Sequence, residues 1–283
     1  MLLDRKLEER VFKLLMQLST IIIVGGLLSI VIVVFVKGAP ALNVQMITQT
    51  SNGGYYLGKE GGILNAIVGS LDLAGGATAI AITISIPAAL YLNEYASRSR
   101  FAAFTRSSLD LLWSVPSIIY GVFGFILMVY LGLGTSLLAG IIALTFLELP
   151  IMIRAMDEVL RTVPQMLKEA SYSLGATKLE TAVRTVIRQA LPGLMMAILL
   201  ALGRAMGDAA SLLFTAGYTD RLPISLFEPV ASLPLAVFFQ LGTPFPAVQQ
   251  RAYASGFILL ALILSISVGS RLLTKRFGRF TIK

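Results

Sequence analysis

The sequence has no cysteine and no histidine among its 283 residues, and only 13% of its residues are charged. Without these two residue types the chain cannot form a disulfide, a thiolate or imidazole metal site, or a histidine-based catalytic triad. More than half of the residues, 56%, are hydrophobic, and the mean hydropathy is +0.83. The composition excludes an ordinary soluble globular domain and indicates a polytopic membrane protein. We expect no enzymatic activity, no metal site and no cofactor of its own in this chain.

The few charges follow a pattern along the chain. The formal net charge is +8 and the sequence pI is near 9.8, which in a soluble protein would suggest a nucleic-acid partner. Here the charges flank apolar runs, as topology signals do, so we expect no nucleic-acid partner. Lysine and arginine gather in alternate segments, namely 5–13, 98–106, 154–188 and 271–283. The positive-inside rule predicts a multi-pass membrane protein with both termini in the cytoplasm.

The hydrophobic runs predict an all-α protein with about six transmembrane helices. About 20 residues cross the hydrocarbon core, so the uncharged run 111–147 is divided at its Gly-Leu-Gly turn, 132–134. The predicted spans are 14–36, 63–91, 108–131, 135–153, 192–216 and 251–273. An amphipathic helix is expected before the first span, which is too long for a signal peptide. The chain thus divides into an N-terminal part with an external loop (1–62), a five-span core (63–273) and a basic tail (274–283).

Two predicted external segments have unusual sequences. Residues 53–59 spell GGYYLGK, the start of a phosphate-binding loop, but Glu60 follows where serine or threonine must hold magnesium. We interpret this as a chance match, so ATP must be bound by another chain. The segment 217–250 is apolar yet broken by five prolines, and it cannot be a full span. We interpret 227–240 as a short or re-entrant helix that closes the outer mouth, with an interfacial loop as the alternative.

One long polar stretch, 164–192, interrupts the apolar runs. Its helical periodicity predicts two short helices, 165–174 and 177–189, with Gly175 supplying the backbone freedom of a tight turn. The pair Leu191-Pro192 is available to end the second helix. The stretch therefore predicts a cytoplasmic hairpin that meets a partner, and a plain solvated loop is the alternative.

A charged pair lies inside the fifth predicted span. Arg204 is about 12 residues past Pro192, which at about 1.5 Å per residue places it roughly 18 Å into the membrane. Asp208 follows one helical turn later. Ionised groups at this depth are costly and mark substrate paths, although mutual neutralisation is the structural alternative.

Three other acids lie near membrane depth. We expect Asp110 and Glu148 to snorkel or to pair with a nearby arginine, and Asp72 to be a helix-terminus or packing residue.

The sequence resembles a known family in two places. Glu169, Ala170 and Ser171, with Gly175 four residues later, resemble the EAA loop of ABC-importer permeases, although the family has alanine where Ser171 stands. Residues 201–208, 211–217 and 231–234 are similar to the fifth span and outer loop of PstA-type permeases of the phosphate ABC importer. The family usually has glutamate where Asp208 stands.

The resemblance implies a type I ABC-importer permease fold in a prokaryotic cytoplasmic (inner) membrane and a coupling helix that docks on an ATPase. It also implies the partners: a second related permease, two ATPase subunits that bind ATP and Mg, and an external phosphate-binding protein. We therefore expect phosphate import past Arg204, driven through Glu169, Ala170, Ser171 and Gly175. The alternatives are import of another oxyanion, such as molybdate or sulfate, and a secondary transporter that uses intramembrane acids as proton carriers. A docking loop argues against the secondary transporter.

Overall fold

The protein is represented by a computed structural model that describes residues 2–52, 60–97 and 99–277. The phosphate-loop-like stretch 53–59 and the last residues of the basic tail lie outside this part. The helices are α1 (Leu2–Gly38), η1 (Ala39–Ala41), α2 (Val44–Thr48), α3 (Leu64–Leu90), η2 (Tyr91–Tyr95), α4 (Arg100–Ser114), α5 (Ser117–Tyr130), α6 (Leu137–Arg161), α7 (Gln165–Ser173), α8 (Lys178–Glu180), η3 (Thr181–Val186), α9 (Ile187–Gly207), α10 (Leu233–Leu241) and α11 (Pro246–Phe277). Both η2 and η3 are π-helical. The strands β1 (Ser51–Asn52) and β2 (Glu60–Gly61) form one short antiparallel pair.

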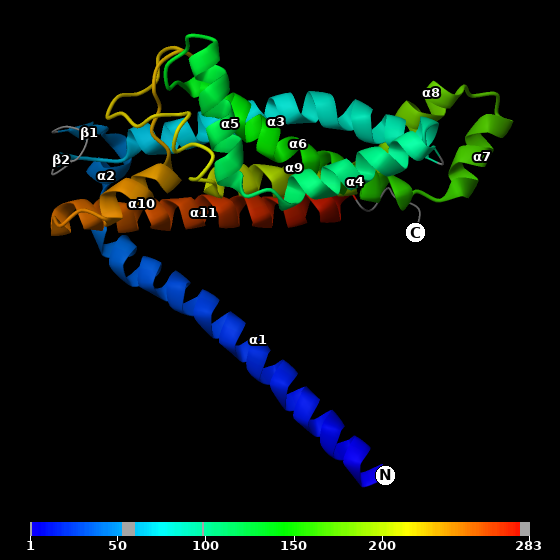
Figure 1. The fold of residues 1–283 in the computed structure, drawn as a ribbon, viewed down its shortest axis with the longest axis horizontal. Coiled ribbons are helices and arrows are strands. Elements are labelled where there is room, and N and C mark those ends of the chain that lie inside the picture. The colour runs from blue at the N-terminus through cyan, green and yellow to red at the C-terminus, as the bar shows by residue number, and fades with distance from the viewer. Residues whose placement is uncertain (1, 53–59, 98, 278–283) are drawn as a thin grey trace.

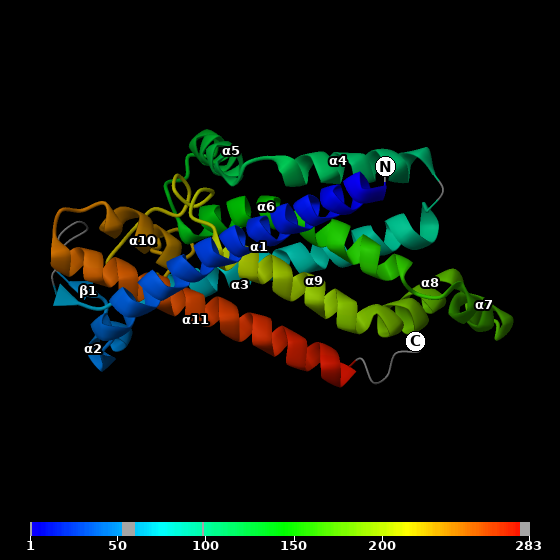
Figure 2. The same cartoon turned by 90° about the horizontal axis from the view of Figure 1, so that it is seen from below.

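The helices confirm an all-α membrane protein of about six spans. Five helical stretches are long and apolar enough to cross a membrane, and the bent pair α4–α5 makes a sixth candidate. Four of them, α3, α6, α9 and α11, lie side by side as one bundle (Figures 1 and 2). The hairpin of α7 and α8 stands at one end of this bundle, and α2 and α10 lie at the opposite end.

Helix α1 leaves this bundle as a single rod (Figure 1). The predicted surface helix and first span are thus one continuous helix. Only its C-terminal end packs against α11, where the rings of Phe35 and Phe257 lie 5.4 Å apart. The remainder of the helix contacts little of this chain and exposes a run of large apolar side chains. Its N-terminal start and the last turn of α11 both lie toward the α7 end.

The third predicted span, 108–131, is wrong as one helix. The chain bends by 96° between α4 and α5. Val115 and Pro116 are extended, with ψ of 129° and 137°, and separate the two helices. The physical reason is the proline, because its ring disfavours the helical conformation of the residue before it.

The fourth predicted span, 135–153, ends too early. Helix α6 continues to Arg161, and this moves Glu148 from a helix end to the middle of the bundle. Glu148 is fully buried and accepts a hydrogen bond of 3.0 Å from the Thr78 hydroxyl of α3. The expectation of an arginine partner is therefore wrong for Glu148. It is confirmed for Asp110, whose Oδ1 lies 2.8 Å from Nε of Arg154.

Asp72 also differs from the expectation. It lies in the third turn of α3, away from the helix ends, and it is exposed. Packing within this chain therefore does not account for it.

The fifth predicted span, 192–216, is wrong at both ends. Helix runs without interruption from Lys178 through η3 to Gly207, so Pro192 lies inside it and the second helix of the hairpin is the start of the span. After Gly207 the chain forms successive turns up to residue 216. Ser211 and Thr215 are fully buried there, which is how irregular backbone at membrane depth is tolerated.

The proline-rich segment after these turns contains a helix, but a shorter one than predicted. Helix α10 spans Leu233–Leu241, while residues 227–232 have no helical structure. The carbonyls of Leu226 and Glu228 accept hydrogen bonds from the first free amides of α6, those of Leu138 and Leu137. Side chains of this segment are buried against α3 and α11, so it is part of the core rather than an interfacial loop.

Candidate functional site

The turn of the hairpin depends on Gly175. Its φ of +84° lies in the left-handed region that favours glycine, as predicted. The amide of Ala176 donates to the Ser171 carbonyl at 3.2 Å, and the amide of Gly175 donates to the Tyr172 carbonyl at 2.9 Å. These two bonds form a Schellman motif, which satisfies the last carbonyls of α7 and reverses the chain.

The second arm of the hairpin begins at a capping box. The Thr177 hydroxyl accepts from the Glu180 amide at 3.3 Å, and the Glu180 carboxylate accepts from the Thr177 amide at 2.9 Å. A direct hydroxyl contact of 2.9 Å between Ser171 and Thr181 then joins the two arms. Ser171 thus links the two arms of the hairpin through its side chain.

The outer surface of the hairpin is apolar and unusually exposed. Met166 and Leu174 are 78% and 89% exposed, and Leu179 on the second arm is 60% exposed. The predicted coupling residues Glu169, Ala170 and Gly175 are exposed too. Large apolar side chains with a polar rim are typical of a protein-binding surface. The geometry therefore favours docking of this end of the chain in a groove of a partner.

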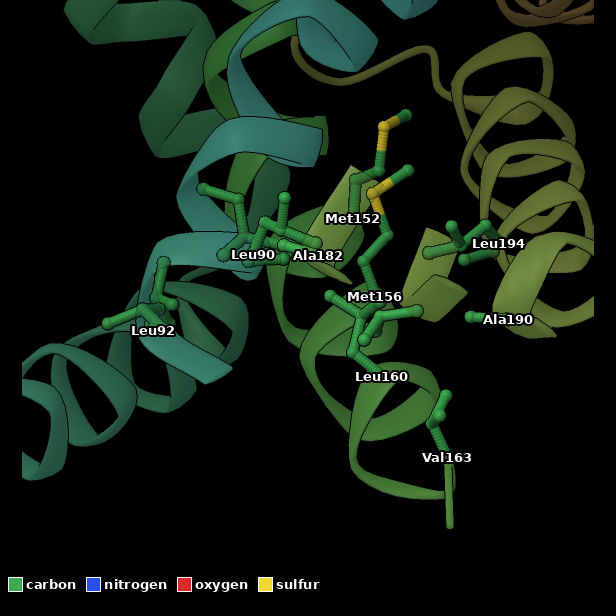
Figure 3. Close-up of a cluster of buried hydrophobic side chains, with 14 of the residues drawn as sticks. Leu90, Leu92, Met152, Met156, Leu160, Val163, Ala182, Ala190 and Leu194 are labelled. Carbon is green, nitrogen blue, oxygen red and sulfur yellow. The ribbon is translucent and has the colours of Figure 1, made fainter. Parts of the chain in front are cut away.

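A buried cluster anchors the base of the hairpin (Figure 3). Met152, Met156 and Leu160 of α6 extend between Leu90 of α3 and Leu194 of α9. Ala182 and Ala190 of the rising second arm belong to the same cluster. The second arm of the hairpin is consequently packed on the bundle helices.

A group of charged side chains surrounds this base, and sequence reasoning did not find it. Asp157 of α6 is fully buried and lies within 2.8 Å of Arg106, 3.4 Å of Arg154 and 3.2 Å of Arg161. Arg154 also pairs with Glu158 at 2.7 Å. Asp157 therefore holds α4 against α6 at this end of the bundle. The only sequence signal was the density of arginines, which indicates topology but not partners.

A polar cavity of about 1000 Å³ lies between this charged group and the hairpin. Its lining comes from η2, α4, the loop after α6, and both arms of the hairpin, and includes Glu94, Arg106, Arg161, Lys168, Glu169 and Lys178. Four of these side chains are basic and two are acidic, so the lining carries an excess of positive charge. In the described ranges no three acidic residues are grouped to hold a metal ion.

The second predicted site lies far from the hairpin along the same helix. Arg204 is in the last turn of α9 and is exposed. From Lys178 to Arg204 the helix rises by roughly 39 Å, at about 1.5 Å per residue. The structure therefore does not bring the coupling residues and Arg204 together, but connects them through one rod.

Asp208 does not lie one helical turn beyond Arg204, because α9 ends at Gly207. Asp208 has an extended backbone, and its carboxylate accepts from the Ser211 amide at 2.9 Å and from the Ser211 hydroxyl. Such a side-chain-to-backbone bond starts a turn and competes with continued helix. Among the ion pairs of the described part of the chain, none joins Arg204 to Asp208. The i, i+4 neutralising pair, which was the structural alternative to a substrate path, is therefore not formed.

Helix α5 rests directly on the turn that Asp208 begins. A Cβ at Gly121 would lie 2.9 and 2.8 Å from the carbonyl oxygens of Ala210 and Ser211, and a Cβ at Gly124 would lie 3.0 Å from the Thr215 methyl group. Only glycine permits so close an approach of helix and backbone. The irregular segment after α9 is therefore positioned by α5.

Comparison with known proteins gives one matching family. The family model described as the binding-protein-dependent transport system inner membrane component matches residues 81–279. The phosphate transport system permease protein PstA of Haemophilus influenzae is 35% identical, over 92% of this chain and 92% of its own length. The phosphate transport system permease protein PstA 1 of Mycobacterium tuberculosis is 36% identical, over 75% and 70%.

Solved structures show the same fold at lower identity. An inward-facing conformation of the MetNI methionine ABC transporter matches with a TM-score of 0.64 and 19% identity, over 76% of this chain and 95% of its chain. At this identity the likeness concerns the fold alone.

Proposed function

This chain belongs to the family of binding-protein-dependent transport system inner membrane components, and from that premise we propose that it is a permease subunit of an ATP-driven importer of inorganic phosphate. The family implies a membrane permease that assembles with an ATPase and a binding protein. It also implies location in the inner membrane. Phosphate as the substrate is supported by the PstA relatives, which the chain matches over most of its length.

One observation carries the role in ATP coupling. A hairpin with a left-handed glycine turn and an exposed apolar surface stands at one end of the bundle and is anchored to three helices. An apolar helix face of this kind is suited to a groove in a partner protein. We assign Glu169, Ala170, Ser171 and Gly175 to this contact, with Ser171 acting inside the hairpin. ATP and Mg belong to the partner ATPase.

The orientation follows from the charges. The hairpin end holds the group of arginines around Asp157, and by the positive-inside rule we place this end in the cytoplasm. Both termini are then cytoplasmic as well, since α1 starts and α11 ends toward the same side (Figures 1 and 2). The complete importer would contain a second related permease, two ATPase subunits and an external phosphate-binding protein.

We assign the substrate path to the exposed face of α9. Leu200 and Arg204 are one turn apart on this face, followed by Gly207, and all three are exposed in the single chain. A path closed by a second permease would cover them. Arg204 then offers a guanidinium to a tetrahedral anion at the membrane midplane, where a bare anion is strongly disfavoured. The Asp208 carboxylate accepts a hydrogen bond from the Ser211 amide and is not paired with Arg204.

Reconstitution tests this function. We would place the chain in liposomes with its cognate second permease, ATPase and phosphate-loaded binding protein, and measure uptake of labelled phosphate. Uptake should require ATP and should not be reduced by excess molybdate or sulfate. Competition by either anion would favour another oxyanion as substrate. Uptake driven by a proton gradient without the ATPase would instead support a secondary transporter.

A further inference from the structure

The hairpin is tied to the cytoplasmic end of α3 by a buried ion pair. Nζ of Lys168 on α7 lies 2.6 Å from Oε1 of Glu94 in η2, and 3.4 Å from the Asn93 side-chain oxygen. The side chains of Lys168 and Glu94 are only 12% and 4% exposed. From the second arm, the Lys178 ammonium lies 4.7 Å from the centre of the Tyr95 ring. Both arms of the hairpin are thus attached to the same five residues, Tyr91–Tyr95.

The other side of η2 is held by α4. The guanidinium of Arg106 donates to the Leu92 carbonyl at 2.9 Å and to both oxygens of Asp157 at 2.8 and 3.1 Å. A π-helical turn leaves backbone groups displaced from the regular ladder, and such turns are frequent at functional sites. Here the displaced backbone connects the hairpin on one side with α4 on the other.

Helix α4 continues into α5 through the 96° bend, and α5 rests on the turn begun by Asp208. The contact at Gly121 is backbone against backbone, so α5 cannot shift without displacing Ala210 and Ser211 or losing the contact. A contiguous series of contacts therefore runs from Lys168 through Glu94, Arg106 and α5 to the end of α9.

We propose that Glu94 and Lys168 are positioning residues that transmit movement of the hairpin, through η2 and α4, to the turn beside Arg204. This inference rests on the proposed function. The route through η2, α4 and α5 is separate from the direct connection along α9. The series joins the two sites that the continuous helix Lys178–Gly207 holds about 39 Å apart. The ion pair suits this role because both groups are buried, so separating them leaves charge uncompensated and the hairpin and η2 must move together.

The test uses the complete importer with four variants of this chain. Glu94→Gln and Lys168→Met each remove one charge of the pair, and the double variant Glu94→Lys with Lys168→Glu reverses it. The matched control is Glu158→Gln, which removes an exposed acid at the same end of the bundle that pairs with Arg154 and not with the hairpin. We would measure ATPase association, ATP hydrolysis, and phosphate imported per ATP hydrolysed.

The single variants should bind the ATPase and hydrolyse ATP, while phosphate imported per ATP falls by at least about tenfold, within the usual range of coupling between sites. The charge-reversed variant should recover most of the ratio, and the control should match the unaltered chain. An unchanged ratio in the single variants would overturn the proposal. Loss of ATPase association in those variants, or a reversed pair as uncoupled as either single variant, would overturn it as well.

A second measurement distinguishes a failure of this inference from a failure of phosphate as the proposed substrate. The Leu200→Cys variant of this cysteine-free chain reports, through thiol labelling, how accessible the exposed face of α9 is with and without ATP. The ATP-dependent change should disappear with Glu94→Gln even if phosphate is not the transported anion. A change that persists in Glu94→Gln would refute the route, whereas failure of the unaltered importer to carry phosphate refutes only the proposed function.

Discussion

Replacing Gly175 by valine tests the hairpin turn most directly. No heavy atom lies within 4 Å of a Cβ built on Gly175, so the substitution creates no clash and acts through the backbone alone. A β-branched residue at φ +84° costs about 2 kcal/mol. At about 1.4 kcal/mol per tenfold, the population of the docking-competent hairpin should fall by roughly 30-fold.

The assay is affinity for the cognate ATPase, measured with detergent-purified protein and followed by ATP-dependent phosphate uptake. Gly132→Val is the matched control, because Gly132 also has a positive φ, of +67°, and also has no heavy atom near its Cβ. It lies in the loop between α5 and α6, away from the hairpin. The control should lose comparable stability yet bind the ATPase normally. Gly175→Asn should be milder than valine, since asparagine tolerates this conformation.

Equal ATPase affinity for Gly175→Val and the unaltered chain would refute the reasoning. So would equal losses for Gly175→Val and Gly132→Val, because the effect would then be general destabilisation rather than a distorted docking surface.

Four further predictions concern single groups. Arg204→Gln should abolish phosphate uptake while the complex still assembles, as size-exclusion chromatography would show; normal uptake would remove Arg204 from the path. Asp208→Asn should keep the turn because the amide oxygen still accepts from Ser211, whereas Asp208→Ala should lower the thermal midpoint; equal midpoints would contradict the turn role. Asp157→Asn should cost about 3 kcal/mol, since three arginines lose a buried partner, and an unshifted unfolding midpoint would contradict this. Cysteines at positions 52 and 178 should be labelled from outside only at Asn52, and outside labelling at Lys178 would reverse the topology.

The hairpin could be predicted well because its signals are local. A glycine that supplies the freedom of a tight turn, helical periodicity and a polar composition between apolar runs are all properties of a few neighbouring residues. The turn at Gly175 and the helix start after Thr177 are therefore where the sequence places them. The apolar runs likewise predict that spans exist, since crossing a membrane requires a minimum length of apolar helix.

The boundaries of the spans were less predictable, because the local helix propensity of a residue competes there with its tertiary packing. Pro116 ends a helix whereas Pro192 lies within one, and both follow apolar residues in the sequence. The difference lies in the surroundings: the second arm of the hairpin is packed on α6 and α3 through Ala182 and Ala190, which holds the helix through the proline. Gly207 and Asp208 end α9 where hydropathy alone predicted nine more residues of span, because the Asp208 side chain captures the Ser211 amide.

The sequence by itself determined the class of the protein, the apolar runs, the alternation of basic segments along the chain and the hairpin between the apolar runs. Each of these depends on composition or on residues close together in the chain. Only the tertiary structure decided what the charges pair with: Glu94 with Lys168, Asp157 with three arginines, and Asp208 with Ser211 rather than Arg204. The physical reason is that an ion pair or hydrogen bond depends on distance in space. Glu94 and Lys168 are 74 residues apart in the sequence, and Arg106 and Asp157 are 51 apart. Only the packing of the bundle brings the members of each pair into contact.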